Sequence, residues 1–267
     1  MTRLRFAILA SLLLATFVPS APAGPSDGPL VPCPDERGCP DLAVDIAQME
    51  AGFPTQRTFT STSCAVVEGS AQVGTRDLWL FSSTINNMGE GDMSLGQPPN
   101  HPEWYEWSPC HGHYHFKDFT AYRLWTVDGF LAWDELRRAE PSKPASQVFA
   151  EHPELASEVR SGHKQGVCPG DIYPATPGTG GVPAAPPSPL PQYTWCWDIG
   201  FGPHEAGIAR GWADLYNAGI DGQWVDMTGI PDGTLMILED EVNPEYLVEE
   251  MDYANNRAFI PLVVVKV

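Results

Sequence analysis

The sequence predicts a mainly β fold, an antiparallel β-sandwich with short helices and long loops. Three observations predict it: apolar and polar residues alternate over many short segments, turn residues separate these segments, and few stretches have helical composition. Many short strands with few helices favour packed antiparallel sheets over a parallel sheet. No internal repeat is evident, so one domain of this kind is expected.

The predicted elements follow in chain order after a Pro/Gly-rich leader. They are strands at 57–67 and 77–85, a loop rich in Gly, Asn and Pro at 86–100, alternation from 111 to 125, short helices at 134–139 and 145–160, and strands at 224–227, 234–242 and 258–267. A segment at 173–192 carries seven prolines from Pro174 to Pro191. It is expected to be a surface insertion or flexible loop without a regular element.

The beginning of the chain has the pattern of a secretory signal peptide at 1–23. Arg3 and Arg5 precede an apolar run at 6–18, and Ala21-Pro22-Ala23 offers small residues for cleavage. The run is too short to span a membrane as a stable helix. A buried core helix is the alternative. Cleavage after Ala23 would give a secreted chain without a membrane span. This chain would begin with a leader at 24–56 that packs on a domain at 57–267.

The chain is strongly acidic, with a formal net charge of −19. Such a surface repels nucleic acid and anionic lipid headgroups and favours cationic ligands or bound cations. Simple solubility explains the charge equally well. All six cysteines follow the predicted signal peptide, which indicates disulfides made in an oxidising compartment. Cys33 and Cys39 are close enough in sequence to pair locally, and the sequence alone leaves the other pairs open.

The densest chemical signal is the run 107–115, in which His111, His113 and His115 alternate. Imidazole is the commonest side-chain ligand for copper and zinc, and alternate residues of a strand face one side. In a flat strand the outer Cβ atoms would lie roughly 13 Å apart, too far for one ion. A single ion therefore requires a bulge or turn, which Gly112 permits. Otherwise two histidines bind and a third ligand comes from elsewhere.

Four groups of residues resemble the lysyl oxidase family, in the family's order and over most of residues 77–259. They are 107–115 with 119–124, 162–168, 214–226, and 242–244 with 250–256. The resemblance implies copper held by His111, His113 and His115. It also implies a lysine tyrosylquinone made from Lys164 and Tyr216. The implied activity is oxidation of a primary amine or peptidyl lysine by O₂ to an aldehyde, with release of hydrogen peroxide and ammonia.

The same resemblance assigns further residues. Asp214 is the first choice for the catalytic base, with Asp221 and Asp226 as weaker candidates and a structural role for Asp214 as the alternative. A calcium ion is implied at a set of oxygen donors near both ends of the domain: Asp41, the carbonyl of Leu42, Glu250, Asp252, Asn255 and Asn256. A polar turn before the last strand is the alternative for the C-terminal part of this set.

The chain departs from animal family members at three points. Ser108 stands where they carry another histidine, the Pro-rich segment between Lys164 and Tyr216 is longer, and several of their cysteines are missing. The disulfides of animal members therefore cannot be transferred whole to this chain. The favoured pair is Cys110 with Cys196, which leaves Cys64 and Cys168 as a second pair. A secreted, non-catalytic β-sandwich that binds copper or calcium is the alternative function.

Overall fold

A computed structural model describes residues 31–33, 38–141, 143–162, 166–176, 183, 186, 189–196 and 204–267. The predicted signal peptide and Lys164 lie outside these residues, as does much of the Pro-rich segment. The strands are β1 (Leu42–Val44), β2 (Phe53–Phe59), β3 (Gly74–Leu80), β4 (Ser83–Asn87), β5 (Met93–Ser94), β6 (Tyr105–Ser108), β7 (His113–Phe116), β8 (Thr120–Trp125), β9 (Val159–Ser161), β10 (Tyr173–Pro174), β11 (Gly207–Ile208), β12 (Trp212–Tyr216), β13 (Trp224–Asp226), β14 (Leu235–Val242) and β15 (Arg257–Val263). The helices are α1 (Ile46–Glu50), α2 (Cys64–Val67), α3 (Val127–Ala139) and α4 (Ala145–Glu151), with 3₁₀ turns η1 (Pro98–Asn100) and η2 (Pro153–Ser157).

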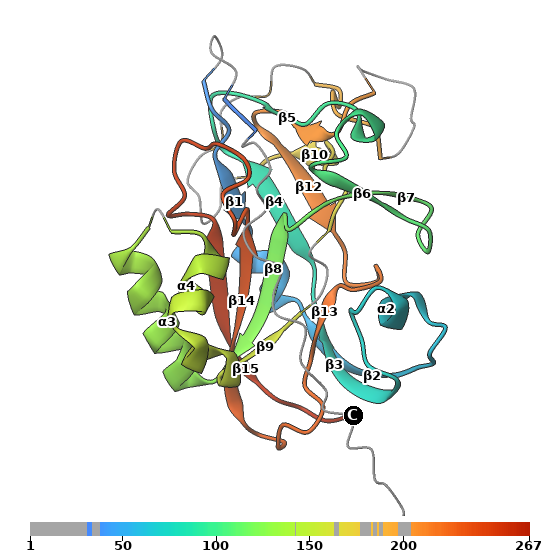
Figure 1. The fold of residues 1–267 in the computed structure, drawn as a ribbon, viewed down its shortest axis with the longest axis vertical. Helices are drawn as coiled ribbons and strands as arrows, with labels where there is room; N and C mark the ends of the chain where they lie inside the picture. The colour runs from blue at the N-terminus through green and yellow to red at the C-terminus, as the bar shows by residue number, and fades with distance from the viewer. Residues whose placement is uncertain are drawn as a thin grey trace, which may run out of the picture.

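Two four-stranded sheets form the centre of the molecule, in the orders β1-β4-β12-β10 and β15-β14-β8-β9 (Figure 1). A three-stranded sheet, β13-β3-β2, and the small pairs β11-β5 and β6-β7 complete the described strands. All of these strand pairs are antiparallel. The predicted mainly β fold with antiparallel sheets is therefore confirmed.

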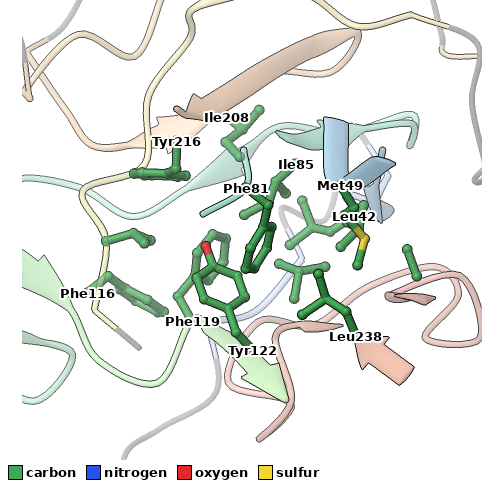
Figure 2. Close-up of a cluster of buried hydrophobic side chains, with 14 of the residues drawn as sticks. Leu42, Met49, Phe81, Ile85, Phe116, Phe119, Tyr122, Ile208, Tyr216 and Leu238 are labelled. Atoms are coloured by element: carbon green, nitrogen blue, oxygen red, sulfur yellow. The ribbon is translucent and has the colours of Figure 1, made fainter. Parts of the chain in front are cut away.

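The main core lies between the two four-stranded sheets. Leu42 and Ile85 from one sheet share a buried cluster with Tyr122 and Leu238 from the other (Figure 2). On the outer face of the second sheet, α3 and α4 cover a smaller aromatic cluster that includes Trp125 (Figure 1). Among the described residues, no helix is long and apolar enough to cross a membrane.

The predicted strand at 57–67 is wrong in its second half, where the chain forms α2 instead. A turn ends β2, because the amide of Ser63 donates to the carbonyl of Thr60 at 3.0 Å and the amide of Thr60 donates to Ser63 Oγ at 2.9 Å. Threonine and serine hydroxyls favour such turns over continued strand. The alternation was therefore a correct signal only as far as Phe59.

The predicted strand at 77–85 is two strands, β3 and β4, which belong to different sheets. The break falls at Phe81 and Ser82. The Phe81 ring is fully buried and meets the Tyr122 ring edge-on at 4.9 Å, while Ser82 Oγ accepts from the amide of Ala218 at 3.1 Å. No glycine or proline marks this break, so the sequence could not reveal the change of sheet.

The helix predictions were correct in type and wrong in extent. α3 begins at Val127, earlier than predicted, because Thr126 Oγ accepts from the amide of Gly129 at 3.1 Å and caps the helix. The second helix ends at Glu151, since Pro153 cannot continue it, and β9 follows. The three strands predicted near the C-terminus are present as β13, β14 and β15, but the last ends at Val263 and not at 267. The Pro-rich segment begins with the short strand β10, contrary to the expected absence of a regular element.

Asp240 is a buried carboxyl on β14 that should give the fold a pH dependence. Burial raises its pKa to about 7, although the Ser83 hydroxyl favours the charged form. The folded state therefore keeps a proton that the unfolded chain releases above pH ~4. Stability from this group is fully present below pH ~4 and is lost as the pH rises to about 7.

We therefore expect Asp240→Asn to gain stability relative to the wild type as the pH rises from 4 to 7, by roughly 1 kcal/mol per pH unit. Denaturant unfolding at several pH values measures this difference. Parallel pH profiles for the two proteins would contradict the assignment.

Candidate metal centre

The three alternating histidines lie at one end of a small hairpin made by β6 and β7. The chain turns between the strands, and Gly112 adopts a φ of +72°, a conformation that L side chains rarely adopt. The amide of Gly112 donates to the carbonyl of Ser108 at 2.8 Å and closes this turn. The turn that a single-ion site requires is therefore present, at the glycine expected to permit it.

This turn brings the imidazole rings together. His111 Nδ1 lies 3.3 Å from His115 Nε2, and His115 Nε2 lies 3.1 Å from His113 Nε2. One nitrogen from each ring falls within 4.8 Å of the other two, a spacing that suits ligands of one ion. His115 is buried, His111 half-buried and His113 exposed, so the centre lies at the surface. The structure thus gathers all three predicted histidines.

Two further groups contact His111, and sequence analysis missed the first of them. Glu68, just after α2, places Oε2 at 3.4 Å from His111 Nδ1 and accepts a short hydrogen bond from the Ser108 hydroxyl at Oε1. Asp221 lies on the other side, with Oδ2 at 3.8 Å from His111 Nε2. Nothing in the sequence pairs Glu68 with the histidines, because the contact depends on the unpredicted helix α2.

Tyr216 and Asp214 form a buried pair on β12. They are two residues apart on one strand, so they face the same side, and the Tyr216 hydroxyl donates a short hydrogen bond to Asp214 Oδ2. Burial raises the pKa of Asp214 to about 8, although this hydrogen bond and the Gly170 amide favour the charged form. Burial also raises the pKa of Tyr216 well above its usual value, and the Asp214 charge adds to the effect. Tyr216 therefore keeps its proton at neutral pH, whereas the Asp214 carboxyl titrates near that pH.

The Tyr216 pair and the histidine hairpin are connected through the fold. Tyr216 and Phe116, the residue after His115, belong to the same core cluster (Figure 2). Asp221, five residues after Tyr216, lies beside His111. The other weak candidate for a base, Asp226, is instead engaged by Arg76 at 2.6 Å. Of the two, only Asp221 reaches the histidines.

Lys164 lies outside the described residues, but its described neighbours lie against the hairpin and β8. The amide of Gly162 donates to the carbonyl of Tyr122 at 2.6 Å, and Val167 forms an isolated bridge with Phe116. A Cβ atom at Gly166 would lie only 2.8 Å from the Cβ of His115. The chain after Lys164 is therefore held against the hairpin, and the chain before it against β8.

Comparison with known proteins supplies the family. Residues 51–134 and 192–264 match the family described as lysyl oxidase, which covers more than half of the chain and includes the three histidines and Tyr216. The chain belongs to the lysyl oxidase family. Lys164 lies between the two matched stretches, so its place rests on its own motif.

Several curated members of the lysyl oxidase family are similar to the chain over most of its length. Lysyl oxidase homolog 1 of Homo sapiens is 30% identical over 231 residues, 82% of this chain and 32% of that protein. Protein-lysine 6-oxidase of Gallus gallus is 29% identical over 231 residues, 82% of this chain and 44% of that protein. Protein-lysine 6-oxidase of Sus scrofa is 28% identical over 231 residues, 82% of this chain and 74% of that protein. The chain thus spans about a third to three quarters of these relatives.

A second group of residues matches the calcium set that the lysyl oxidase resemblance implied. Asn255 Nδ2 donates to Asp41 Oδ1 at 2.8 Å, and the Leu42 amide donates to Glu250 Oε2 at 2.6 Å. Asn256 Nδ2 reaches Glu250 Oε1 at 2.8 Å, while Asp252 Oδ1 accepts from the amide of Ala254. The structure therefore brings the two ends of the domain together at these residues.

The electrostatics of this second group suit a cation. Burial raises the pKa of Glu250 to about 8 and, together with the charge of Asp252, raises the pKa of Asp41. The amide oxygens of Asn255 and Asn256 are buried, and neither has a hydrogen-bond partner among the described residues. A hard cation would satisfy such oxygens and favour the charged carboxylates.

The disulfides correct one expectation and confirm another. Cys33 pairs locally with Cys39, as the spacing allowed. The favoured pairs Cys110–Cys196 and Cys64–Cys168 are wrong, because the chain forms Cys64–Cys110 and Cys168–Cys196. The reason is α2: it lies against the hairpin turn and puts the Cα atoms of Cys64 and Cys110 5.6 Å apart. Cys168 and Cys196 then join the two sides of the Pro-rich segment.

Proposed function

We propose that the protein is a secreted oxidase that uses copper and lysine tyrosylquinone to deaminate primary amines, either peptidyl lysine or small amines, to aldehydes. O₂ is the second substrate, and hydrogen peroxide and ammonia are the other products. The observation that carries the proposal is the convergence of three histidine nitrogens within 4.8 Å, in a fold that also buries Tyr216. Membership of the lysyl oxidase family and the names of its curated relatives support the same chemistry.

The residues at the hairpin fit a copper ion. Imidazole nitrogens suit copper, and three of them converge here without a carboxylate among the gathered atoms. His111 presents Nδ1 toward His115, whereas its Nε2 is buried and lies 3.8 Å from Asp221 Oδ2. His111, His113 and His115 would hold the metal.

Tyr216 and Lys164 are the proposed precursors of the quinone. Copper and O₂ would supply the oxidation of the tyrosine ring, and the finished quinone would supply the carbonyl that takes electrons from the amine. Tyr216 is held in the core by its neighbours, and Val167, three residues after Lys164, bridges to Phe116 of the hairpin. These positions favour a link between the two side chains.

Asp214 is the proposed base. Its carboxyl, with a pKa raised to about 8 by burial, both takes up and returns a proton near neutral pH. Its Oδ2 receives the Tyr216 hydroxyl, and its Oδ1 is buried without a hydrogen-bond partner among the described residues. We propose that Asp214 holds the proton lost from Tyr216 and later the proton removed from the carbon next to the substrate nitrogen.

The disulfides and the charge of the chain bear on its location and its substrate. Three disulfides among the described residues fit an oxidising compartment, in agreement with a signal peptide at 1–23 and a secreted protein. The net charge of −19 favours cationic amines over nucleic acid as partners.

A calcium ion at the second site should stabilise the fold. Added calcium is expected to raise the stability of the wild-type protein by about 2.7 kcal/mol at a concentration 100 times its Kd. Asp252→Ala should lose most of this gain, whereas Glu249→Gln, a neighbouring change outside the set, should keep it. Thermal unfolding with and without a chelator measures the effect. Equal melting temperatures for the wild-type protein in both conditions would rule out calcium and favour a polar turn.

Turnover of primary amines tests the proposed function. Copper-loaded protein incubated in air with a lysine-containing peptide or a small amine should release peroxide and ammonia in equal amounts. Absence of turnover in protein that binds one copper and contains the oxidised tyrosine would contradict it. Copper binding without any oxidised tyrosine would instead indicate the non-catalytic metal-binding β-sandwich.

A further inference from the structure

We propose that Glu68 is a positioning residue of the metal centre, which holds His111 in its binding orientation through Ser108 and at the imidazole itself. This inference rests on the metal-binding part of the proposed function and adds to it a residue on a different element. It does not depend on whether the quinone forms.

Glu68 contacts His111 by two routes, one through Ser108 and one at the ring. Glu68 Oε1 accepts from the Ser108 hydroxyl, and Ser108 Oγ in turn accepts from the backbone amide of His111 at 3.0 Å. Glu68 Oε2 lies 3.4 Å from His111 Nδ1. One carboxylate therefore acts on the backbone of His111 through Ser108 and on its ring directly.

The chain holds Glu68 firmly in this place. Its amide donates to the carbonyl of Cys64 at 2.9 Å, which closes the last turn of α2. Cys64 is bonded to Cys110, the residue before His111. The disulfide thus fixes α2 against the hairpin turn, four residues from the carboxylate. A side chain on a mobile surface loop would lack this support.

Asp221 completes the arrangement from the opposite side of the ring. It lies 3.8 Å from His111 Nε2, while Glu68 lies near Nδ1. His111 Nδ1 is the nitrogen that faces His115, so Nε2, beside Asp221, is the nitrogen left for a second partner. Metal-binding histidines commonly donate their second N–H to such a group, which sets the tautomer and increases the basicity of the ligand.

A purely structural surface contact is the competing explanation. The Glu68 side chain is 26% exposed, and exposed ion pairs typically contribute little to stability. The two explanations differ in what they predict for copper. A surface contact would leave copper affinity and the copper spectrum unchanged, whereas a positioning residue must alter both.

The test is copper binding by Glu68→Gln, measured by competition with a chromophoric chelator and by electron paramagnetic resonance. Glu68 contacts the ligand His111 but not the metal, and loss of such a residue is expected to weaken copper binding about 10–100-fold. The resonance parameters of the bound copper should also shift. Glu68→Asp should restore part of the affinity, and Glu50→Gln, the same charge change at an exposed site on α1, should leave it unchanged.

A second variant tests the same link if Glu68→Gln fails to fold. Ser108→Ala keeps the carboxylate but removes its link to the His111 backbone, so it should weaken copper binding in the same direction. Affinities within about twofold of wild type for both variants, with unchanged spectra, would overturn the inference. Failure of the wild-type protein to bind copper would refute the proposed metal centre itself, which is a separate result.

Discussion

His113→Ala is expected to abolish copper binding while the apoprotein still folds. His113 is exposed, so its removal opens no cavity in the core. Its Nε2 lies 3.1 Å from His115 Nε2, and two histidines alone would leave the ion with an incomplete set of protein ligands. Loss of a residue that hydrogen-bonds to a ligand weakens metal binding about 10–100-fold. Removal of a ligand itself should weaken copper binding more than this. Oxidation of Tyr216, which needs the metal, should then fail as well.

Metal analysis after dialysis measures this loss, and thermal unfolding of the apoprotein checks the fold. His152→Ala serves as the matched control, because His152 contacts Glu154 at the end of α4 and lies apart from the hairpin in sequence and structure. Retention of one tightly bound copper by the His113 variant would show that the ion lies elsewhere.

Tyr216→Phe and Lys164→Ala are expected to eliminate amine oxidation and to retain copper. Both remove a precursor of the quinone and leave the three histidines in place. The two variants should differ in stability. Tyr216→Phe deprives the buried Asp214 carboxyl of its hydrogen-bond donor, at a cost of about 1–3 kcal/mol in the free energy of unfolding.

Tyr105→Phe provides the control for Tyr216→Phe. Tyr105 is also buried, and its hydroxyl has no hydrogen-bond partner among the described residues. Its removal should therefore cost no stability and leave turnover intact. Measurable amine oxidation by copper-loaded Tyr216→Phe or Lys164→Ala would disprove the assigned cofactor.

Sequence reasoning predicted the grouping of the three histidines because its signal is local. The alternation of His111, His113 and His115 and the need for a turn at Gly112 both follow from strand geometry, and the structure shows that turn. The strands near the C-terminus were found for the same reason, since each carries its own apolar pattern.

The change of sheet and the missed pairings involve contacts between distant segments, whereas the wrong helix bounds have local causes. No glycine or proline marks the change of sheet at Phe81, so only the packing against Tyr122 reveals it. Helix α2 depends on a turn at Thr60 and Ser63 and on the disulfide to Cys110. Because α2 was missed, Glu68 and the true disulfide pairs were missed with it.

The proposed oxidase requires a covalent link between Lys164 and Tyr216. Peptide mass mapping of copper-loaded protein tests this link most directly. We expect one cross-linked species that joins the two peptides, with the mass change of a quinone, and its absence in protein kept free of copper. Two unlinked, unmodified peptides after full copper loading in air would contradict the oxidase and favour a metal-binding protein.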